Sequence, residues 1–256
     1  MNIPERESAP DQAARKRAKI SHLGCDAGRL ALFYREWASS YNRDVGGEKY
    51  YGPIAVAELA AVVQTAYLAS ERGAIRVLDA GCGTGLVGVQ LARLGFQLID
   101  GFDLTEEMAG EARRTGVYRN IQVDADLNMI LPEYPNATYD ITVCCGVFGL
   151  GQVRPEGLRE LARVTRPNGF VIASTSRLYL EATSFEEEVR RLQQGGVVVP
   201  TQCLSDGRYI ADEPANYWVF RIVHNPTRQR SDSYDSQISM GNAKEPERPC
   251  GQSEED

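Results

Sequence analysis

The end of a predicted buried strand, Val77–Ala80, leads directly into the glycine loop Gly81–Gly85, and the apolar start of a helix follows at Leu86. Glycine adopts positive φ readily and, having no Cβ, lets a ligand approach the backbone closely. A tight turn from a strand into a helix needs only one glycine, whereas three alternate with other residues here. The loop therefore predicts a site for a nucleotide-like ligand.

Asp79, two residues before the loop, distinguishes between two kinds of nucleotide ligand. Gly83–Gly88 matches the G-x-G-x-x-G pattern of dinucleotide-binding proteins, but the loop begins earlier, at Gly81, so the match is out of register. Asp79 carries a carboxylate that would repel a pyrophosphate at the N-terminus of the following helix. It would attract a ligand with a cation and no phosphate, such as S-adenosylmethionine. The residues therefore favour this cofactor over NAD.

Two further acidic positions follow predicted strands. Asp103 comes directly after the predicted strand Gln97–Phe102, where a carboxylate can accept hydrogen bonds from ribose hydroxyls. The predicted strand Arg119–Val123 is followed by Asp124–Leu127, where an acid can accept a hydrogen bond from an adenine amino group. Asp126 is favoured over Asp124 for this contact, and a solvated turn acid is the alternative for both.

Helix and strand patterns alternate along the chain. Parallel strands connected by helices have their carboxyl ends at one edge of the sheet, so this alternation would bring the glycine loop and the acids together. The predicted strands are Ile75–Ala80, Gln97–Phe102, Arg119–Val123, Tyr139–Cys145, Phe170–Ser174, Val197–Leu204 and Tyr217–Val223. The predicted helices are Arg29–Tyr41, Ile54–Ser70, Leu86–Leu94, one capped by Thr105, Pro155–Thr165 and Ser184–Gln194.

This alternation predicts an α/β fold, a doubly wound Rossmann-like sheet of seven strands that is mostly parallel. A polar loop without a crossover helix joins the last two strands, so the last strand is expected to pair antiparallel. Ligands of such sheets bind at the carboxyl ends of the strands.

The two ends of the chain are too poor in apolar residues to offset the entropy of ordering. We therefore expect a disordered N-terminal tail at 1–20, a helical cap at 21–72, a ligand-binding core at 73–224 and a disordered acidic tail at 225–256.

The composition excludes several classes of protein. The chain has 28 basic and 35 acidic residues, a net charge of −7, which argues against binding to nucleic acid. No apolar run approaches the ~20 residues of a membrane-spanning helix, and residues 1–20 lack the apolar core of a signal peptide. The six cysteines contain no C-x-x-C pair and there are only two histidines. We expect a reduced, cytoplasmic protein that binds no metal and no membrane.

Together, the motifs resemble those of the class I S-adenosylmethionine-dependent methyltransferases. The segments that carry this resemblance are Asp79–Gly85, Gly101–Met108, Asp124–Leu127, Tyr139-Asp140 and Arg163–Gly169. The chain is also similar to the Williams–Beuren-syndrome critical-region methyltransferase-like proteins, in Phe33–Tyr41, Gly116–Tyr118 and Gly149–Val153. The resemblance covers residues 30–224.

The resemblance implies S-adenosyl-L-methionine as the cofactor and methyl transfer by in-line displacement. It implies that Asp79 neutralises the ammonium group, directly or through water, that Asp103 binds the ribose and that Leu104 packs on the adenine. The remaining cofactor contacts that it implies in the core are Ala80, Gly81, Gly83, Met108, Ala125, Asp126, Leu127 and Cys145.

Three aromatic residues, Tyr34, Trp37 and Tyr41, share the predicted helix before the core. This helix is placed to close over the cofactor, and an aromatic face suits a sulfonium. Tyr34 and Tyr41 are therefore candidate cofactor contacts. The alternative is that all three are core residues, and for Trp37 this is at least as well supported.

No catalytic residue is assigned. Methyl transfer needs an acceptor aligned about 3 Å from the methyl carbon in a dry site, and a general base helps only when the acceptor must lose a proton. The side chains after the fourth and fifth strands, Gln152, Ser176, Arg177 and Tyr179, include no strong base. His22 precedes the cap and is near enough in sequence to reach the site, whereas His224 is expected to face away.

The acceptor is expected to be a small molecule. The fourth strand ends in Cys144–Val147 and not in the Asn/Asp-Pro-Pro-Tyr sequence of nucleic-acid amino methyltransferases. Because no long N-terminal dimerisation domain is present, we expect a monomer or weak homodimer. An alternative stays open: a protein of this fold that binds the cofactor but has a pericyclic or regulatory role, since binding and transfer use the same loop.

Overall fold

The computed structural model describes residues 9–224 of the 256-residue chain. The chain divides into two units, Met1–Pro226 and Thr227–Asp256, and every described residue belongs to the first. The predicted tail at 225–256 and residues 1–8 of the predicted N-terminal tail lie outside the described residues.

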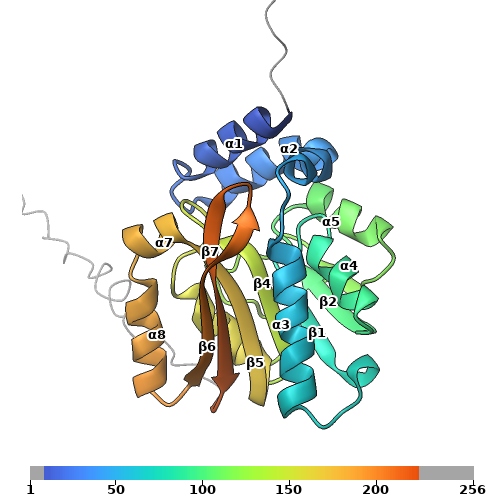
Figure 1. The fold of residues 1–256 in the computed structure, drawn as a ribbon, viewed down its shortest axis with the longest axis vertical. Coiled ribbons are helices and arrows are strands. Elements are labelled where there is room, and N and C mark those ends of the chain that lie inside the picture. The colour runs from blue at the N-terminus through green and yellow to red at the C-terminus, as the bar shows by residue number, and fades with distance from the viewer. Residues whose placement is uncertain (1–8, 225–256) are drawn as a thin grey trace, which may run out of the picture. The chain divides into compact units, whose positions relative to one another are not determined.

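Seven strands form one sheet in the order β3-β2-β1-β4-β5-β7-β6 (Figure 1). Their bounds are β1 (Arg76–Ala80), β2 (Leu98–Phe102), β3 (Asn120–Gln122), β4 (Tyr139–Phe148), β5 (Thr165–Ser176), β6 (Val198–Ile210) and β7 (Glu213–Ile222). All neighbours pair parallel except β7, which is antiparallel to both β5 and β6. The predicted Rossmann-like sheet with an antiparallel last strand is confirmed.

The strand order reverses between β1 and β4, because the chain adds β2 and β3 on one side of β1 and then returns to add β4 on the other. Ligands of doubly wound sheets bind in the crevice at the carboxyl ends of the strands beside such a reversal. The glycine loop follows β1 and Asp103 follows β2, so both lie at this edge of the sheet.

Helices cover both faces of the sheet. They are α3 (Gly52–Tyr67), α4 (Leu86–Arg93), α5 (Glu106–Arg114), α6 (Gly157–Val164), α7 (Arg177–Ala182) and α8 (Phe185–Gln194), with a 3₁₀ turn, η1 (Arg72–Ala74). Successive side chains of a strand point to opposite faces, so Val77 and Leu78 of β1 belong to different core clusters. The cluster of Val77 includes α3 and α4, and that of Leu78 includes α6, α7 and α8.

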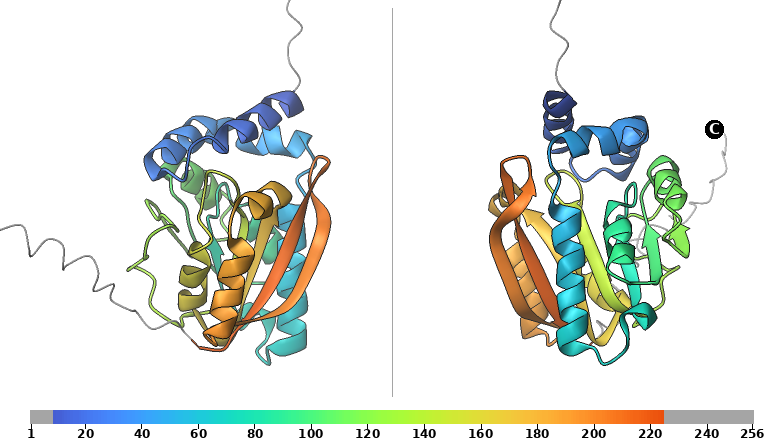
Figure 2. Two further views of the ribbon diagram at one scale, coloured as in Figure 1. Left: turned by 90° about the vertical axis from the view of Figure 1, so that its left-hand side faces the viewer. Right: turned by 45° about the vertical axis from the view of Figure 1, so that its right-hand side comes forward.

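Two more helices, α1 (Ala9–Ile20) and α2 (Ala27–Gly47), lie over the carboxyl ends of the strands, as the two views of Figure 2 show. Trp37 of α2 is buried in a cluster with Ile20 of α1, Leu30 of α2 and Ile210 of β6. These two helices form the cap. Helix α3, which the predicted cap of 21–72 included, packs on the sheet instead, because its apolar side chains join the core cluster of Val77.

The predicted disorder of residues 1–20 is wrong for residues 9–20, which form α1. Two basic residues of α1 are paired with buried carboxylates of the cap. Lys16 Nζ lies 2.8 Å from Asp44 Oδ2, and Arg17 pairs with Glu48. Both partners lie about thirty residues further along the chain, and Ile20 at the end of α1 is buried.

Elsewhere the predicted helices and strands are all present, with shifted ends, but one connection differs. The polar loop predicted between the last two strands is a hairpin, in which β6 continues to Ile210 and β7 begins at Glu213. The polar side chains of this segment are typical of a loop, but they also suit an edge strand. Strand β6 lies at the edge of the sheet and most of its residues are exposed. Helix α7, Arg177–Ala182, was not predicted.

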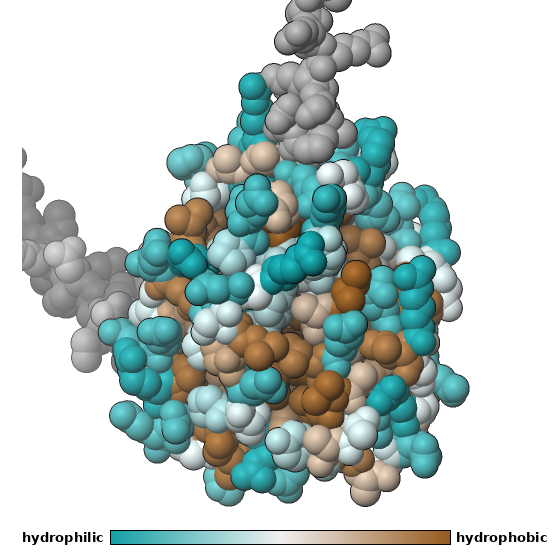
Figure 3. All heavy atoms as spheres, viewed as in Figure 1, coloured by the Kyte–Doolittle hydropathy of each residue, from teal (hydrophilic) through white to brown (hydrophobic). Residues whose placement is uncertain are grey.

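Several apolar side chains remain exposed on α3, including Ile54, Val62 and Tyr67, and Figure 3 shows apolar residues gathered on this face of the molecule. Among the described residues, no helix has the length and apolar character needed to cross a membrane.

We predict that Asp44→Ala loosens the cap. Asp44 is 1% exposed, and its Oδ2 accepts hydrogen bonds from Lys16, Trp37 Nε1 and Ser40. Burial raises its pKa, but these bonds outweigh burial and lower the pKa to about 2. The substitution leaves buried donors without an acceptor, so urea unfolding should show a loss of about 2–4 kcal/mol at pH 7.

The control is Asp212→Ala, which removes an exposed carboxylate in the β6–β7 turn. Its unfolding free energy should stay within about 0.5 kcal/mol of the wild type. Equal unfolding curves for Asp44→Ala and the wild type would show that Asp44 does not anchor α1.

Candidate functional site

The glycine loop at the end of β1 needs glycine for both conformation and space. Gly81, Gly83 and Gly85 have φ values of +70°, +53° and +89°, a region that other residues rarely adopt. A Cβ at Gly81 would lie 2.5 Å from Val147 Cγ2, at the end of β4. Gly85 forms the N-cap of α4. The three glycines therefore let the loop turn closely between β1 and β4.

Asp103, directly after β2, fixes the same loop. Its Oδ2 accepts a hydrogen bond from the Gly83 amide at 2.9 Å, and its Oδ1 accepts one from the Thr105 amide at 3.0 Å. Burial raises the pKa of Asp103, while the bonds from Thr105 and Gly83 oppose this shift. Thr105 in turn caps α5 by accepting from the Met108 amide, as predicted.

A cavity of about 100 Å³ lies against this loop and brings most of the predicted cofactor residues together. Those that line it are Tyr34, Tyr41, Gly81, Gly83, Asp103, Leu104, Met108, Ala125, Asp126, Leu127 and Cys145. The sequence reasoning missed Leu30, Phe102, Asn128, Val147 and Val153 as lining residues. Leu30 lies one helical turn before Tyr34, so the helical spacing was a signal that pointed to it.

The acid after β3 that faces the cavity is Asp126. Its Oδ1 accepts hydrogen bonds from the amide and the side chain of Asn128, both at 2.9 Å. Asp124 is exposed, has a φ of +56°, and does not line the cavity. Asp126, which the sequence favoured over Asp124, is therefore the acid of this pair that lines the cavity.

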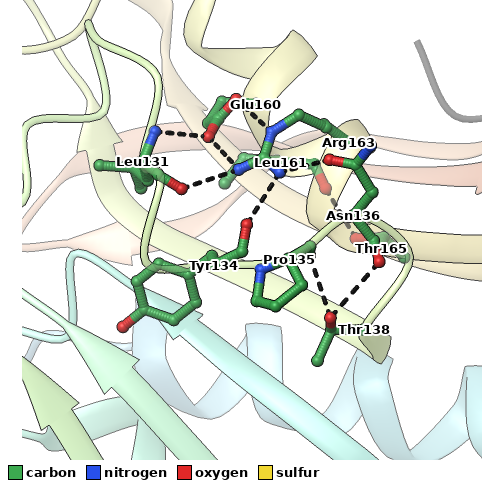
Figure 4. Close-up of polar contacts among 9 residues, drawn as sticks. All are labelled: Leu131, Tyr134, Pro135, Asn136, Thr138, Glu160, Leu161, Arg163 and Thr165. Atoms are coloured by element: carbon green, nitrogen blue, oxygen red, sulfur yellow. Dashed lines mark hydrogen bonds and ion pairs between the residues drawn. The ribbon is translucent and has the colours of Figure 1, made fainter. Parts of the chain in front are cut away.

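The segment that carries Asp126, 123–138, contains no helix or strand and is held by a buried ion pair of α6 (Figure 4). Arg163 Nε donates to Glu160 Oε2 at 2.8 Å. Glu160 Oε1 accepts from the Leu131 amide at 2.7 Å, while Arg163 donates to the carbonyls of Leu131 and Tyr134 at 3.0 and 2.8 Å. The irregular backbone therefore has fixed hydrogen-bond partners, which position the cavity wall.

Two predicted cofactor residues, Asp79 and Ala80, do not line the cavity. Ala80 is fully buried in the core, on the face of the sheet that α6–α8 cover. Asp79 is 1% exposed; its Oδ2 accepts a hydrogen bond from the Tyr118 hydroxyl at 2.6 Å, and its Oδ1 has no hydrogen-bond partner.

Asp79 is an unusual acid for its position. Burial raises its pKa, the hydrogen bond from Tyr118 lowers it, and nearby Asp103 raises it, with a net value of about 7. A buried carboxylate oxygen without a partner is costly. A cationic group supplies the charge and the donor that this oxygen lacks, so the residues present fit the ammonium group of S-adenosylmethionine.

A second cavity, of about 310 Å³, adjoins the first beneath the cap. Four residues line both cavities: Tyr34, Tyr41, Gly146 and Gln152. The Tyr34 hydroxyl donates to Gln152 Oε1 at 2.9 Å. Trp37 lines only the larger cavity and is otherwise a core residue of the cap.

Only some of the side chains that the sequence analysis considered as bases line a cavity. Gln152 and Ser176 line the larger cavity. Arg177 is exposed and paired with Asp206, while the buried Tyr179 hydroxyl donates to the Val153 carbonyl. His22 and His224 are exposed and line neither cavity.

The described part of the chain contains no group of three or more His, Cys, Asp or Glu residues arranged to hold a metal ion.

Comparison with known proteins agrees with this arrangement. Residues 77–169 match the family described as "Methyltransferase domain". Human methyltransferase-like protein 27 is 33% identical over 195 residues, which cover 74% of this chain and 76% of that protein. Ubiquinone biosynthesis O-methyltransferase of Xanthomonas oryzae is 32% identical over 102 residues, which cover 39% of this chain and 42% of that enzyme.

The fold is also found in magnesium protoporphyrin IX methyltransferase of Synechocystis, whose crystal structure contains bound SAH. It superposes with a TM-score of 0.50 over 68% of this chain and 84% of that chain, at 16% identity. The identity to the human protein is twice as high and extends over three quarters of both sequences. This chain therefore belongs to the class I S-adenosylmethionine-dependent methyltransferases, in the family of methyltransferase-like protein 27.

Proposed function

We propose that the protein transfers the methyl group of S-adenosylmethionine to a small-molecule acceptor held in the larger cavity. The observation that carries this proposal is the pair of adjoining cavities, joined along Tyr34, Tyr41, Gly146 and Gln152. The bound cofactor supplies a methyl group on a positively charged sulfur, and an acceptor in the adjoining cavity is in reach of it.

The residues of the smaller cavity would hold the cofactor. Gly81 and Gly83 let it approach the backbone of the loop, and Asp103 accepts hydrogen bonds from the ribose. Leu104 and Met108 supply apolar contact, and Asp126 lies at the adenine end. Cys145 does not act as a nucleophile in this scheme, because burial raises the pKa of its thiol to about 12.

The wall of the larger cavity supports a neutral, flat and largely apolar acceptor. Its aromatic side chains are Tyr34, Trp37, Tyr41, Tyr50, Phe148 and Tyr209. The charged residues in its wall, Arg17 and Glu213, are paired with each other at 3.1 Å. A cavity for a strongly anionic acceptor would need cations free of such pairing.

Two hydroxyl groups lie at the junction of the cavities. A Cβ at Gly146 would be 2.6 Å from the Tyr50 hydroxyl and 2.9 Å from the Tyr209 hydroxyl. Burial raises the pKa of both tyrosines well above its usual range, so both stay neutral. They are therefore suited to orient an oxygen or nitrogen of the acceptor by hydrogen bonding, and not to remove its proton.

The names of related enzymes point to oxygen as the acceptor atom: the relatives include ubiquinone biosynthesis and malonyl-[acyl-carrier protein] O-methyltransferases. The expected monomer or weak homodimer and the expected cytoplasmic location stay predictions.

The test is incubation of the protein with tritium-methyl S-adenosylmethionine and a metabolite extract. Label should move to a small neutral compound with the wild type and not with Asp103→Ala. Binding of the cofactor without transfer to any compound would contradict the proposed methyl transfer and favour the pericyclic or regulatory alternative.

Asp103→Ala should weaken binding of S-adenosylhomocysteine. It removes two charge-assisted hydrogen bonds to the ribose, each worth about 1.5–3 kcal/mol. Because water replaces some of these hydrogen bonds in the variant, we expect the binding free energy to fall by about 2–4 kcal/mol. Calorimetry should then show an affinity that is roughly 30- to 1,000-fold lower. The melting temperature should also fall, because the amides of Gly83 and Thr105 lose their acceptor.

Two variants make this result specific. Asp206→Ala removes an exposed acid of β6 and should leave the affinity unchanged. Asp103→Asn keeps one oxygen acceptor and should melt closer to the wild type than Asp103→Ala. Wild-type affinity in Asp103→Ala would mean that the ribose is held elsewhere.

Asp79→Asn should stabilise the ligand-free protein at high pH while weakening cofactor binding. A carboxyl group whose pKa is raised from 3.8 to about 7 contributes full stability below pH 4, which is lost as the pH rises through 7. The amide cannot ionise, so urea unfolding at pH 8 should show a gain of about 1–3 kcal/mol. Affinity for S-adenosylhomocysteine should fall at least about tenfold.

The matched control is Asp100→Asn, which removes a carboxylate paired with Arg119 and should not stabilise the protein. If Asp79→Asn has the same stability as the wild type at pH 8, Asp79 is not a strained acid in the folded protein.

A further inference from the structure

We propose that Tyr118 is a positioning residue that holds Asp79 for the ammonium group of the cofactor. This inference rests on the proposed cofactor site, because it gives Asp79 its part in binding. Tyr118 lies in the loop before β3 and does not line either cavity, so it acts through Asp79.

The Tyr118 hydroxyl joins two elements at the start of the site. It donates to Asp79 Oδ2 at the end of β1, at 2.6 Å, and it accepts from the Gly88 amide of α4, at 3.2 Å. The Gly88 amide lies in the first turn of the helix, where it has no partner within the helix. One hydroxyl group therefore satisfies a helix amide and a buried carboxylate on either side of the glycine loop.

Two glycines make room for the tyrosine ring. A Cβ at Gly88 would lie 2.3 Å from the Tyr118 hydroxyl, and one at Gly101 of β2 would lie 3.1 Å from Tyr118 Cε1. Neither glycine has a positive φ, so their backbone conformation does not require glycine. Glycine inside a helix or a strand is unfavourable. Space for Tyr118 is the reason that the structure offers for Gly88, while at Gly101 both Tyr118 and Cys82, whose Sγ would lie 3.2 Å from a Cβ, leave room only for glycine.

The hydrogen bond from Tyr118 gives a partner to only one of the two carboxylate oxygens of Asp79. Oδ2 is held by Tyr118, while Oδ1 is buried without a partner. A carboxylate held at one oxygen has a fixed orientation and one oxygen free for a donor. Because the bond favours the charged form, Tyr118 also keeps Asp79 ionised at a lower pH than burial alone would allow.

The groups around Asp79 limit what else can set its ionisation. Asp103 faces it from the end of β2 and raises its pKa. Cys82 of the loop and Cys144 and Cys145 of β4 are also close, but burial raises the pKa of all three thiols, so they stay neutral. Among these neighbours, Tyr118 and the Gly88 amide favour the carboxylate.

The experiment is calorimetric titration of the full chain between pH 5.5 and 8.5 with two ligands. S-adenosylhomocysteine carries the ammonium group, whereas 5′-methylthioadenosine keeps the nucleoside and the sulfur but lacks that group. In the wild type, affinity for the first should rise with pH through about 7, as Asp79 ionises. Affinity for the second should change much less.

Tyr118→Phe keeps the ring between Gly88 and Gly101, so the fold should survive. Loss of the hydroxyl should move the pH midpoint for S-adenosylhomocysteine upward by about one unit. It should leave the affinity for 5′-methylthioadenosine within about twofold, because that ligand offers nothing to Asp79. Asp79→Asn should remove the pH dependence.

The matched control is Tyr139→Phe, because Tyr139 donates to Asp100 at 3.2 Å in a tyrosine–aspartate pair outside the site. It should not move the pH midpoint. The proposal is overturned if Tyr118→Phe keeps the wild-type midpoint, or if it weakens both ligands equally at every pH. If the wild type binds neither ligand, the proposed cofactor site itself fails.

Discussion

The hydrogen bond from the Gly83 amide to Asp103 is the contact on which the proposed cofactor cavity depends. It joins the loop after β1 to the end of β2, across the two strands that pair in parallel next to the reversal of strand order. A backbone donor and a carboxylate can meet only if the loop turns through positive φ, which its three glycines provide. The same carboxylate then receives the amide that begins α5, so one residue fixes loop, strand and helix.

Much of this arrangement could be predicted, because it depends on neighbours in the sequence. The conformation of the glycines and the helix cap at Thr105 depend only on residues nearby in the sequence. The acids follow strand ends, and the parallel sheet brings these strand ends to one edge. Other features depend on distant partners. Arg17 pairs with Glu48 and Glu213, and Asp79 with Tyr118, and no local pattern indicates either pairing. The order of α1 and the pairing of Asp79 with Tyr118 therefore became visible only in the structure.

The burial of Asp79 is a cost to stability that its proposed part in cofactor binding would explain. A carboxyl group with a pKa near 7 and an unpaired oxygen is an unfavourable choice for a core position, where an apolar residue would pack without cost. The chain compensates for one oxygen only, with a tyrosine that two small residues accommodate. A site that satisfied both oxygens would be more stable, but it would have nothing to offer a cationic ligand.

The proposed cofactor and acceptor cavities draw on different parts of the chain, although Leu30, Tyr34 and Tyr41 of α2 also line the smaller one. The segment that matches the methyltransferase family, 77–169, contains the glycine loop, Asp103, Asp126 and Cys145. Much of the wall of the larger cavity comes from outside that segment, from α1, α2 and the β6–β7 hairpin. Its contacts include Arg17 to Glu213, which ties α1 to the first residue of β7. Apart from Tyr34 and Tyr41, the residues proposed to bind the cofactor lie in the matched segment and can stay the same while the cap and the hairpin change, so similarity over the core identifies the reaction better than the acceptor.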